Sequence, residues 1–133
     1  MLRFYLILCT GVILLTCFSG CKPSLPYEIV PFSGTVTYQG KPAPNTEIIF
    51  APEIGRPSNG RTDANGRFTM IYTVQYNGVQ KGKGKFFFQT SRMIGDNSIV
   101  SELQKVLEKY GAENTPLQFD IQKAEKNFEI KLE

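Results

Sequence analysis

The side chains that could do chemistry in this chain are few, because its 133 residues include no histidine. Histidine is the commonest general base, the commonest zinc ligand and the usual partner of serine and cysteine nucleophiles. A hydrolase that uses carboxylates alone stays open, and its candidate residues are Glu47, Glu53, Asp63 and Asp120. Their spacing pairs none of them, and most fall in expected turns or on the outward faces of expected strands. We therefore expect a protein that is not an enzyme and that holds no cofactor and no metal.

The stretch Asp63-Ala64-Asn65-Gly66 resembles part of a calcium loop. The full pattern needs more oxygen ligands and a glutamate at its end. Position 67 is arginine, and residues 67–75 contain neither glutamate nor aspartate. An Asn-Gly pair between two strand patterns is instead a strong hairpin signal. We expect a plain turn here, in which Asp63 accepts backbone hydrogen bonds.

Three lysines alternate with glycines at Lys81, Lys83 and Lys85, and in an extended chain they would project to one side. Such a patch could meet phosphate, an acidic polysaccharide or lipid headgroups. A solvated turn, whose glycines allow an awkward entry into the next strand, also explains the pattern, and we favour it. The net charge of +3 is too small and too dispersed to indicate nucleic-acid binding.

The cysteines all lie within the first 21 residues, together with an uncharged run over residues 4–18. This run is short for a membrane-spanning helix, which needs about 20 apolar residues. The basic start and the small residues after the run are typical of a secretory signal peptide. Phe18-Ser19-Gly20-Cys21 resembles the bacterial lipobox, in which the cysteine is lipidated and becomes the first residue of the mature chain. Phe18 departs from the leucine that usually opens the motif.

The lipobox resemblance implies that residues 1–20 are a signal peptide and that Cys21 carries the lipid. Cys9 and Cys17 would leave with the signal peptide, so the mature chain would keep no free thiol for a disulfide, a metal or a nucleophile. Acyl chains would hold the protein at a membrane surface without spanning it. Lys22 stands where an aspartate signals inner-membrane retention in some bacteria, which favours the outer membrane. An ordinary cleaved signal peptide and an uncleaved N-terminal anchor stay open as alternatives.

The rest of the chain divides into a tether and one domain. Residues 21–31 would comprise the lipidated cysteine and an extended spacer, because three prolines between Lys22 and Pro31 disfavour helix. Residues 32–133 have the length of a single domain. Its alternating segments predict strands near 33–39, 46–51, 67–73, 85–91, 117–121 and 127–132, with a seventh near 74–80.

One segment near 98–110 has helical period instead. Its apolar residues fall on one face of a short helix: Ile99, Leu103, Val106, Leu107 and Tyr110. This face could be a partner site, but we expect it to pack over the strand that contains Phe86–Phe88. The sequence therefore predicts an all-β fold, a sandwich of seven (six to eight) strands with one short inserted helix.

Two stretches of the domain resemble the carboxypeptidase regulatory-like domain. They are Ser33-Gly34-Thr35-Val36-Thr37-Tyr38-Gln39-Gly40-Lys41-Pro42 and Thr62-Asp63-Ala64-Asn65-Gly66-Arg67-Phe68, with Ile48-Ile49-Phe50 between them. The resemblance implies a prealbumin-like (transthyretin-like), immunoglobulin-like β-sandwich. In carboxypeptidases this domain accompanies a separate zinc-bearing catalytic domain, of which this sequence contains no part. Hydroxyisourate hydrolases share the general fold but use histidines, so no functional residue can be carried over.

These observations predict a non-enzymatic lipoprotein of the cell envelope. Its membrane contact would be the lipid anchor at Cys21, and its domain would bind an envelope protein or a glycan. A mechanical spacer without a ligand is the alternative, and a hydrolase built on the carboxylates is a third.

Overall fold

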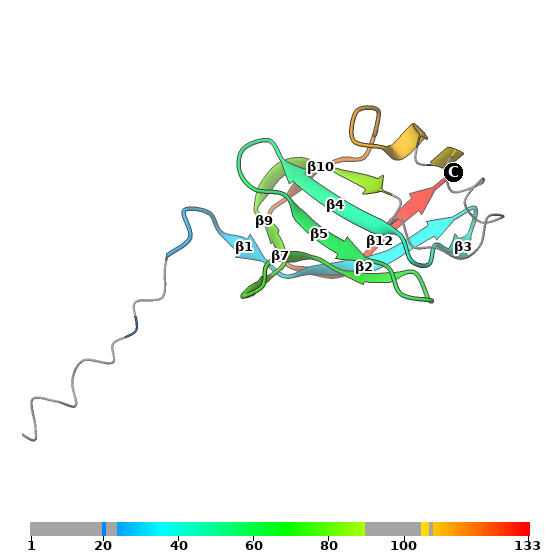
Figure 1. Ribbon diagram of the computed structural model, residues 1–133. Helices are drawn as coiled ribbons and strands as arrows, with labels where there is room; N and C mark the ends of the chain where they lie inside the picture. The colour runs from blue at the N-terminus through cyan, green and yellow to red at the C-terminus, as the bar shows by residue number, and fades with distance from the viewer. Residues whose placement is uncertain (1–19, 21–23, 90–104, 107) are drawn as a thin grey trace, which may run out of the picture.

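The computed structural model describes residues 20, 24–89, 105–106 and 108–133, and in these residues the chain forms a β-sandwich (Figure 1). The larger sheet has the strand order β11-β10-β4-β5-β7-β8. The smaller sheet has the order β12-β2-β3, with β6 also paired to β2, and β1 pairs separately with β9. In chain order the strands are β1 (Ile29–Val30), β2 (Phe32–Tyr38), β3 (Lys41–Pro42), β4 (Glu47–Pro52), β5 (Ser58–Arg61), β6 (Arg67–Thr69), β7 (Ile71–Thr73), β8 (Tyr76–Asn77), β9 (Val79–Gln80), β10 (Gly82–Gln89), β11 (Gln118–Ile121) and β12 (Glu125–Leu132).

The all-β sandwich is confirmed, but its twelve short strands exceed the seven expected. Part of the difference is that the strand expected over 67–73 is interrupted at Met70, where the chain crosses between the sheets. The Met70 amide donates to the Phe32 carbonyl at 2.9 Å, and the Met70 carbonyl accepts from the Gly78 amide at 2.7 Å. The segment expected over 74–80 is likewise divided at Gly78, so two expected strands become four.

The strand β5 lies between the strands expected over 46–51 and 67–73, where the sequence predicted none. Its residues Ser58 and Gly60 are buried and alternate with exposed neighbours. A Cβ on Gly60 would lie 2.8 Å from the Thr69 carbonyl oxygen and 3.0 Å from the Met70 sulfur. The inward positions of this strand therefore hold small residues, and the hydrophobic alternation that marks the other strands is missing from it.

The smaller sheet depends on a close approach between β2 and β12, which run parallel. Gly34 pairs with Phe128, and a Cβ at position 34 would lie only 1.9 Å from the Phe128 carbonyl oxygen. Glycine is thus required there by space, since any side chain would push the strands apart.

The core between the sheets is built from phenylalanines of both layers. Phe50 and Phe86 of the larger sheet have ring centroids 4.9 Å apart, and Phe32 and Phe128 of the smaller sheet also lie 4.9 Å apart. Phe86 joins the layers, with its ring centroid 5.6 Å from that of Phe32. The buried residues of these strands alternate along the chain and point into this cluster: Ile48 and Phe50, Phe86 and Phe88, Ile130 and Leu132.

The helix predicted near 98–110 is described at residues 105–106 and 108–110. Val106 and Tyr110 are buried in the same core as Phe86 and Phe88, so these two side chains pack inward and do not form a partner surface. The Tyr110 hydroxyl accepts from the Glu133 amide at 3.2 Å, which fixes the helix beside the end of β12. The other residues of the predicted face, Ile99, Leu103 and Leu107, lie outside the described residues, as do positions 90 and 91 of the strand expected over 85–91.

Candidate functional site

The N-terminal segment is attached to the domain earlier than the sequence suggested. Residues Ile29–Val30, expected within the spacer over 21–31, form β1 and pair with β9. One residue before, the Glu28 carboxylate contacts the Lys81 ammonium at 2.9 Å, and the Glu28 carbonyl accepts from the Lys81 amide at 2.9 Å. Only residues 22–27 are left between Cys21 and this attachment. At about 3.1 Å per residue, an extended spacer of that length reaches about 20 Å, compared with about 30 Å for the whole predicted tether.

A groove runs over the outer face of β4, β10 and β11, with a volume of about 520 Å³. We call it the β10 groove, and it is lined by Ala51, Pro52, Glu53, Lys83, Gly84, Lys85, Gln118, Phe119 and Asp120. Its floor is low beside the small side chain of Ala51. Gly84 faces the core instead, where a Cβ would lie 2.6 Å from both the Ala51 carbonyl oxygen and the buried Phe50 ring.

The lysines of the predicted basic patch are divided by the fold. Lys81 lies before β10 and forms the ion pair with Glu28. Gly82, with φ 126°, separates Lys81 from the two lysines on β10. Lys83 and Lys85 lie two residues apart on β10 and share its outer face. The Lys85 ammonium donates to the Ala112 carbonyl. Within the described chain Lys83 forms no ion pair, and its strand partner is Asp120.

The four candidate carboxylates are only partly brought together. Glu53 and Asp120 both line the β10 groove. Glu47 lies at the opposite end of β4, and Asp63 lies in the turn between β5 and β6. Glu53 and Asp120 are exposed, and Asp120 accepts a hydrogen bond from the Gln122 side-chain amide. A carboxylate-only glycosidase needs one carboxyl group kept protonated by burial, and neither of these side chains is buried.

The Asp63 turn has the conformation that the sequence predicted. The Asp63 carboxylate accepts from the amides of Asn65 at 2.8 Å and Arg67 at 2.9 Å. Gly66 has φ 72°, and its amide donates to the Asp63 carbonyl at 3.0 Å. Asp63 is therefore used in the turn itself. Across the part of the chain that the structure describes, no three acidic or cysteine side chains are grouped so as to hold a metal ion.

The outer face of the smaller sheet is polar and has two shallow hollows that meet at Thr35 and Glu129. Their volumes are about 470 and 520 Å³. The Glu129 carboxylate lies 3.7 Å from the Lys131 ammonium, and both side chains are exposed. The lining of these hollows includes Thr35, Thr37 and Lys131, so this face is a second candidate surface.

One buried polar residue was missed by sequence reasoning. Gln80 is 5% exposed, its side-chain nitrogen donates to the Ile54 carbonyl, and its side-chain oxygen has no partner within the described chain. A Cβ on Gly55, where φ is 122°, would lie 2.0 Å from that oxygen. The loop over residues 53–57 is therefore built directly on the Gln80 side chain. In the sequence, the only indication of this contact was a polar residue, Gln80, next to Val79 in an expected strand.

In the described part of the chain, no helix is long and apolar enough to cross a bilayer. Comparison with protein-family models, with curated proteins and with solved structures gave no match. The resemblance to the carboxypeptidase regulatory-like domain thus stays a prediction. So does the lipidation of Cys21, which lies outside the described residues.

Proposed function

We propose that this protein is a non-enzymatic lipoprotein of the cell envelope, anchored at Cys21, with the outer membrane favoured. Its domain would be a carboxypeptidase regulatory-like sandwich that binds an envelope protein or a glycan. The observation that carries the proposal is the N-terminal attachment: the chain that follows the lipobox-like motif joins the sandwich directly through Glu28 and β1. Such a short connection suits a domain that works close to the surface holding its anchor.

The β10 groove is the surface that best supports a binding role. It combines a cation at Lys83, carboxylates at Glu53 and Asp120, and the side-chain amide of Gln118. A mixed set of charges beside an amide suits an extended polar chain with hydrogen-bonding groups of both kinds. Because the groove is open and its charged groups are exposed, it favours binding over catalysis.

Two other functions compete with this proposal. A mechanical spacer would need no groove. Failure to recover any partner would favour the spacer function. A carboxylate hydrolase gains one observation, because Glu53 and Asp120 line the same groove. Their exposure argues against it, since water would screen both groups throughout the reaction.

The anchor is tested by mass spectrometry of the protein isolated from membranes. We expect the mature chain to begin at a Cys21 that carries diacylglycerol. An intact Met1, or a free N-terminus at another residue, would overturn the anchoring at Cys21.

The binding role is tested by cross-linking the tagged protein in its own membrane and identifying the partners. Lys83→Glu changes the β10 groove, and Lys131→Glu is the matched control on the outer face of the other sheet. We expect a partner that is recovered with the unmodified protein and with Lys131→Glu but lost with Lys83→Glu. Equal recovery with all three proteins would exclude the groove, and no partner in any of them would favour the spacer.

A further inference from the structure

The end of the sandwich at which the N-terminal segment enters is formed by two connections of the larger sheet. They are the β4–β5 loop over residues 53–57 and the β7–β8 turn over residues 74–75, and with residues 24–28 we call them the tether end. The antiparallel registers place both connections there: Phe50 pairs with Ser58 next to the loop, and Thr73 pairs with Tyr76 next to the turn. In Figure 1 both lie beside β1, where the chain enters the domain.

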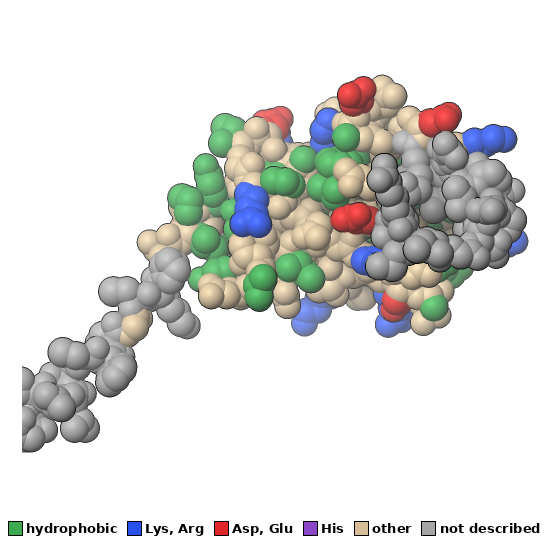
Figure 2. Space-filling view, in the orientation of Figure 1, with side chains coloured by type: hydrophobic (Ala, Val, Ile, Leu, Met, Phe, Trp, Pro, Cys, Tyr) green, Lys and Arg blue, Asp and Glu red, His purple; other side chains and the backbone are tan. Residues whose placement is uncertain are grey.

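The exposed large hydrophobic residues of the described chain are concentrated at this end. Ile54 in the loop is 73% exposed, and Val74 in the turn is 102% exposed. The other two are Tyr27, in the N-terminal segment, and Ile71, on the strand that leads into the turn. Figure 2 shows apolar side chains gathered where the N-terminal segment leaves the domain. Single exposed hydrophobic residues are ordinary on protein surfaces, but a group at one end indicates a contact.

The β4–β5 loop presents Ile54 from a fixed backbone. The buried Gln80 amide donates to the Ile54 carbonyl, and the Glu53 amide donates to the Lys83 carbonyl at 2.9 Å. Gly55 fits against the Gln80 side chain only because it has no Cβ. A loop held in this way keeps its apolar side chain pointing outward, although folding back onto the core would have buried it.

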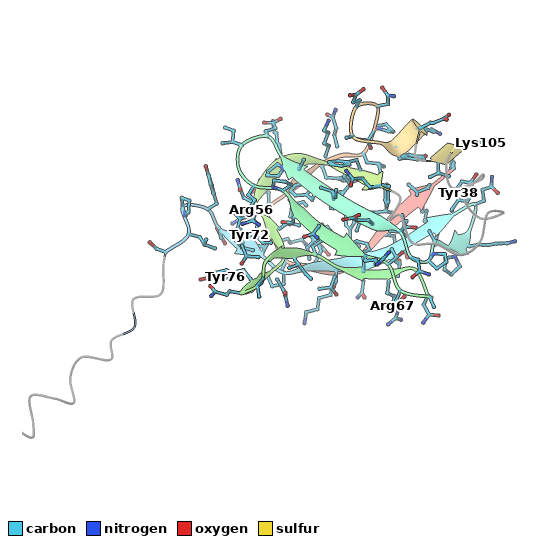
Figure 3. All side chains as sticks on the ribbon, in the orientation of Figure 1. Tyr38, Arg56, Arg67, Tyr72, Tyr76 and Lys105 are labelled. Carbon is cyan, nitrogen blue, oxygen red and sulfur yellow. The ribbon has the colours of Figure 1, made fainter. Side chains whose placement is uncertain are left out.

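The charge at this end is mixed, because the exposed Glu53 precedes Ile54 in the loop and Glu28 pairs with Lys81. Arg56 follows Ile54 in the same loop, and it forms no ion pair within the described chain. Figure 3 shows Arg56 at the tether end together with Tyr72 and Tyr76, while Tyr38, Arg67 and Lys105 lie toward the opposite end. A guanidinium group beside an apolar tip suits a boundary at which phosphates lie just above hydrocarbon.

We propose that the tether end docks on the lipid bilayer, with Ile54 and Val74 in the boundary between headgroups and acyl chains and Arg56 at the phosphates. This inference rests on the proposed anchoring at Cys21. The occupant follows from the chain length, because residues 24–27 leave the domain at this same end and an extended segment of six residues would span about 20 Å. The lipid anchor would supply most of the affinity and the loops would set the orientation.

The test uses single cysteines carrying an environment-sensitive fluorophore, since the processed chain would have no other free thiol. Ile54→Cys and Val74→Cys report on the tether end, and Lys41→Cys, exposed on β3, is the matched control at the opposite end. The full-length proteins are expressed, recovered from membranes and reconstituted into phosphatidylcholine–phosphatidylglycerol vesicles that contain lipids with a nitroxide on the acyl chain. We expect labels at 54 and 74 to shift to shorter wavelength and lose most of their emission, and the label at 41 to keep it.

A second variant separates docking from simple closeness to the membrane. Val74→Asp in the labelled Ile54→Cys protein should restore most of the emission, because a carboxylate opposes insertion of the turn. Circular dichroism would check that the exposed substitution leaves the fold intact. Quenching that persists in this variant, with the fold intact, would overturn the docking.

The outcomes distinguish this inference from the anchoring. Acylated Cys21 with equal emission at all three positions would overturn the docking and leave the anchor in place. If Cys21 is not acylated, the same proteins with the added substitutions Cys9→Ser, Cys17→Ser and Cys21→Ser are supplied to vesicles from outside. Quenching at 54 and 74 would then support the docking without the anchor, and its absence would overturn both.

Discussion

The chain reverses direction at both ends of the sandwich, but different side chains hold the two reversals. At the Asp63 turn, the side chain of a polar residue satisfies the turn's own amides, and every recognisable feature of the sequence is used for the fold. At the tether end, the loop rests on a buried glutamine from a different strand and leaves Ile54 exposed. The stretch with the most motif-like sequence is therefore structural, while the candidate contact lies on loops without a motif.

The largest loss of stability should come from truncating the core on which both ends depend. Phe86→Ala removes the ring that joins the two layers, and such truncations cost about 3–5 kcal/mol of stability. Urea unfolding should show this loss, and both ends should become sensitive to proteolysis together. Phe87→Ala, at the half-buried neighbouring position on the outer face, is the control and should cost clearly less. Cleavage confined to one end in Phe86→Ala would show that the ends do not depend on a common core.

The next effect concerns the tether end alone. Gln80→Ala should lower the free energy of unfolding by about 1–3 kcal/mol, because the Ile54 carbonyl loses its donor and a space opens beneath Gly55. Urea unfolding measures the loss, and limited proteolysis should find a new cleavage site within residues 53–57. A variant that is equally stable and equally resistant would show that the loop does not depend on this side chain.

The smallest effect concerns the Asp63 turn. Asp63→Ala should lower the free energy of unfolding by about 1 kcal/mol, because two exposed backbone amides lose the carboxylate and bind water instead. Asp63→Asn keeps an acceptor oxygen and should retain most of the stability. Calcium or a chelator should leave the melting temperature of all three proteins unchanged. A rise in melting temperature with calcium, present only when Asp63 is intact, would revive the calcium interpretation.

Much of the fold could be predicted because its signals are local. Alternation placed Phe128, Ile130 and Leu132 inward, and the Asn65-Gly66 pair placed the turn that Asp63 completes. The strand at Ser58–Arg61 was not predicted, because its inward residues are small and lack hydrophobic alternation. Its burial is decided by packing against Ile48 of β4 and against Thr69 and Met70, which only the fold brings to it.

The candidate site was less predictable than the fold. The three alternating lysines suggested one patch, but the positive φ at Gly82 and the Glu28 carboxylate remove Lys81 from it. Glu53 and Asp120 are 67 positions apart in the numbering and line one groove only because β4 and β11 flank β10. No spacing rule links residues that are joined through a third strand.

By itself the sequence determined the class of the domain and its turns, and it carries the lipobox-like motif at Cys21. Alternation and turn chemistry act between neighbours in the chain, so they can be read without a model of the fold. Only the tertiary structure decided that the chain crosses sheets at Met70, that β1 shortens the spacer, and that Ile54 and Val74 share the end from which the spacer leaves. These features depend on the register between strands that are far apart in sequence, and that register is set by the packing of the core.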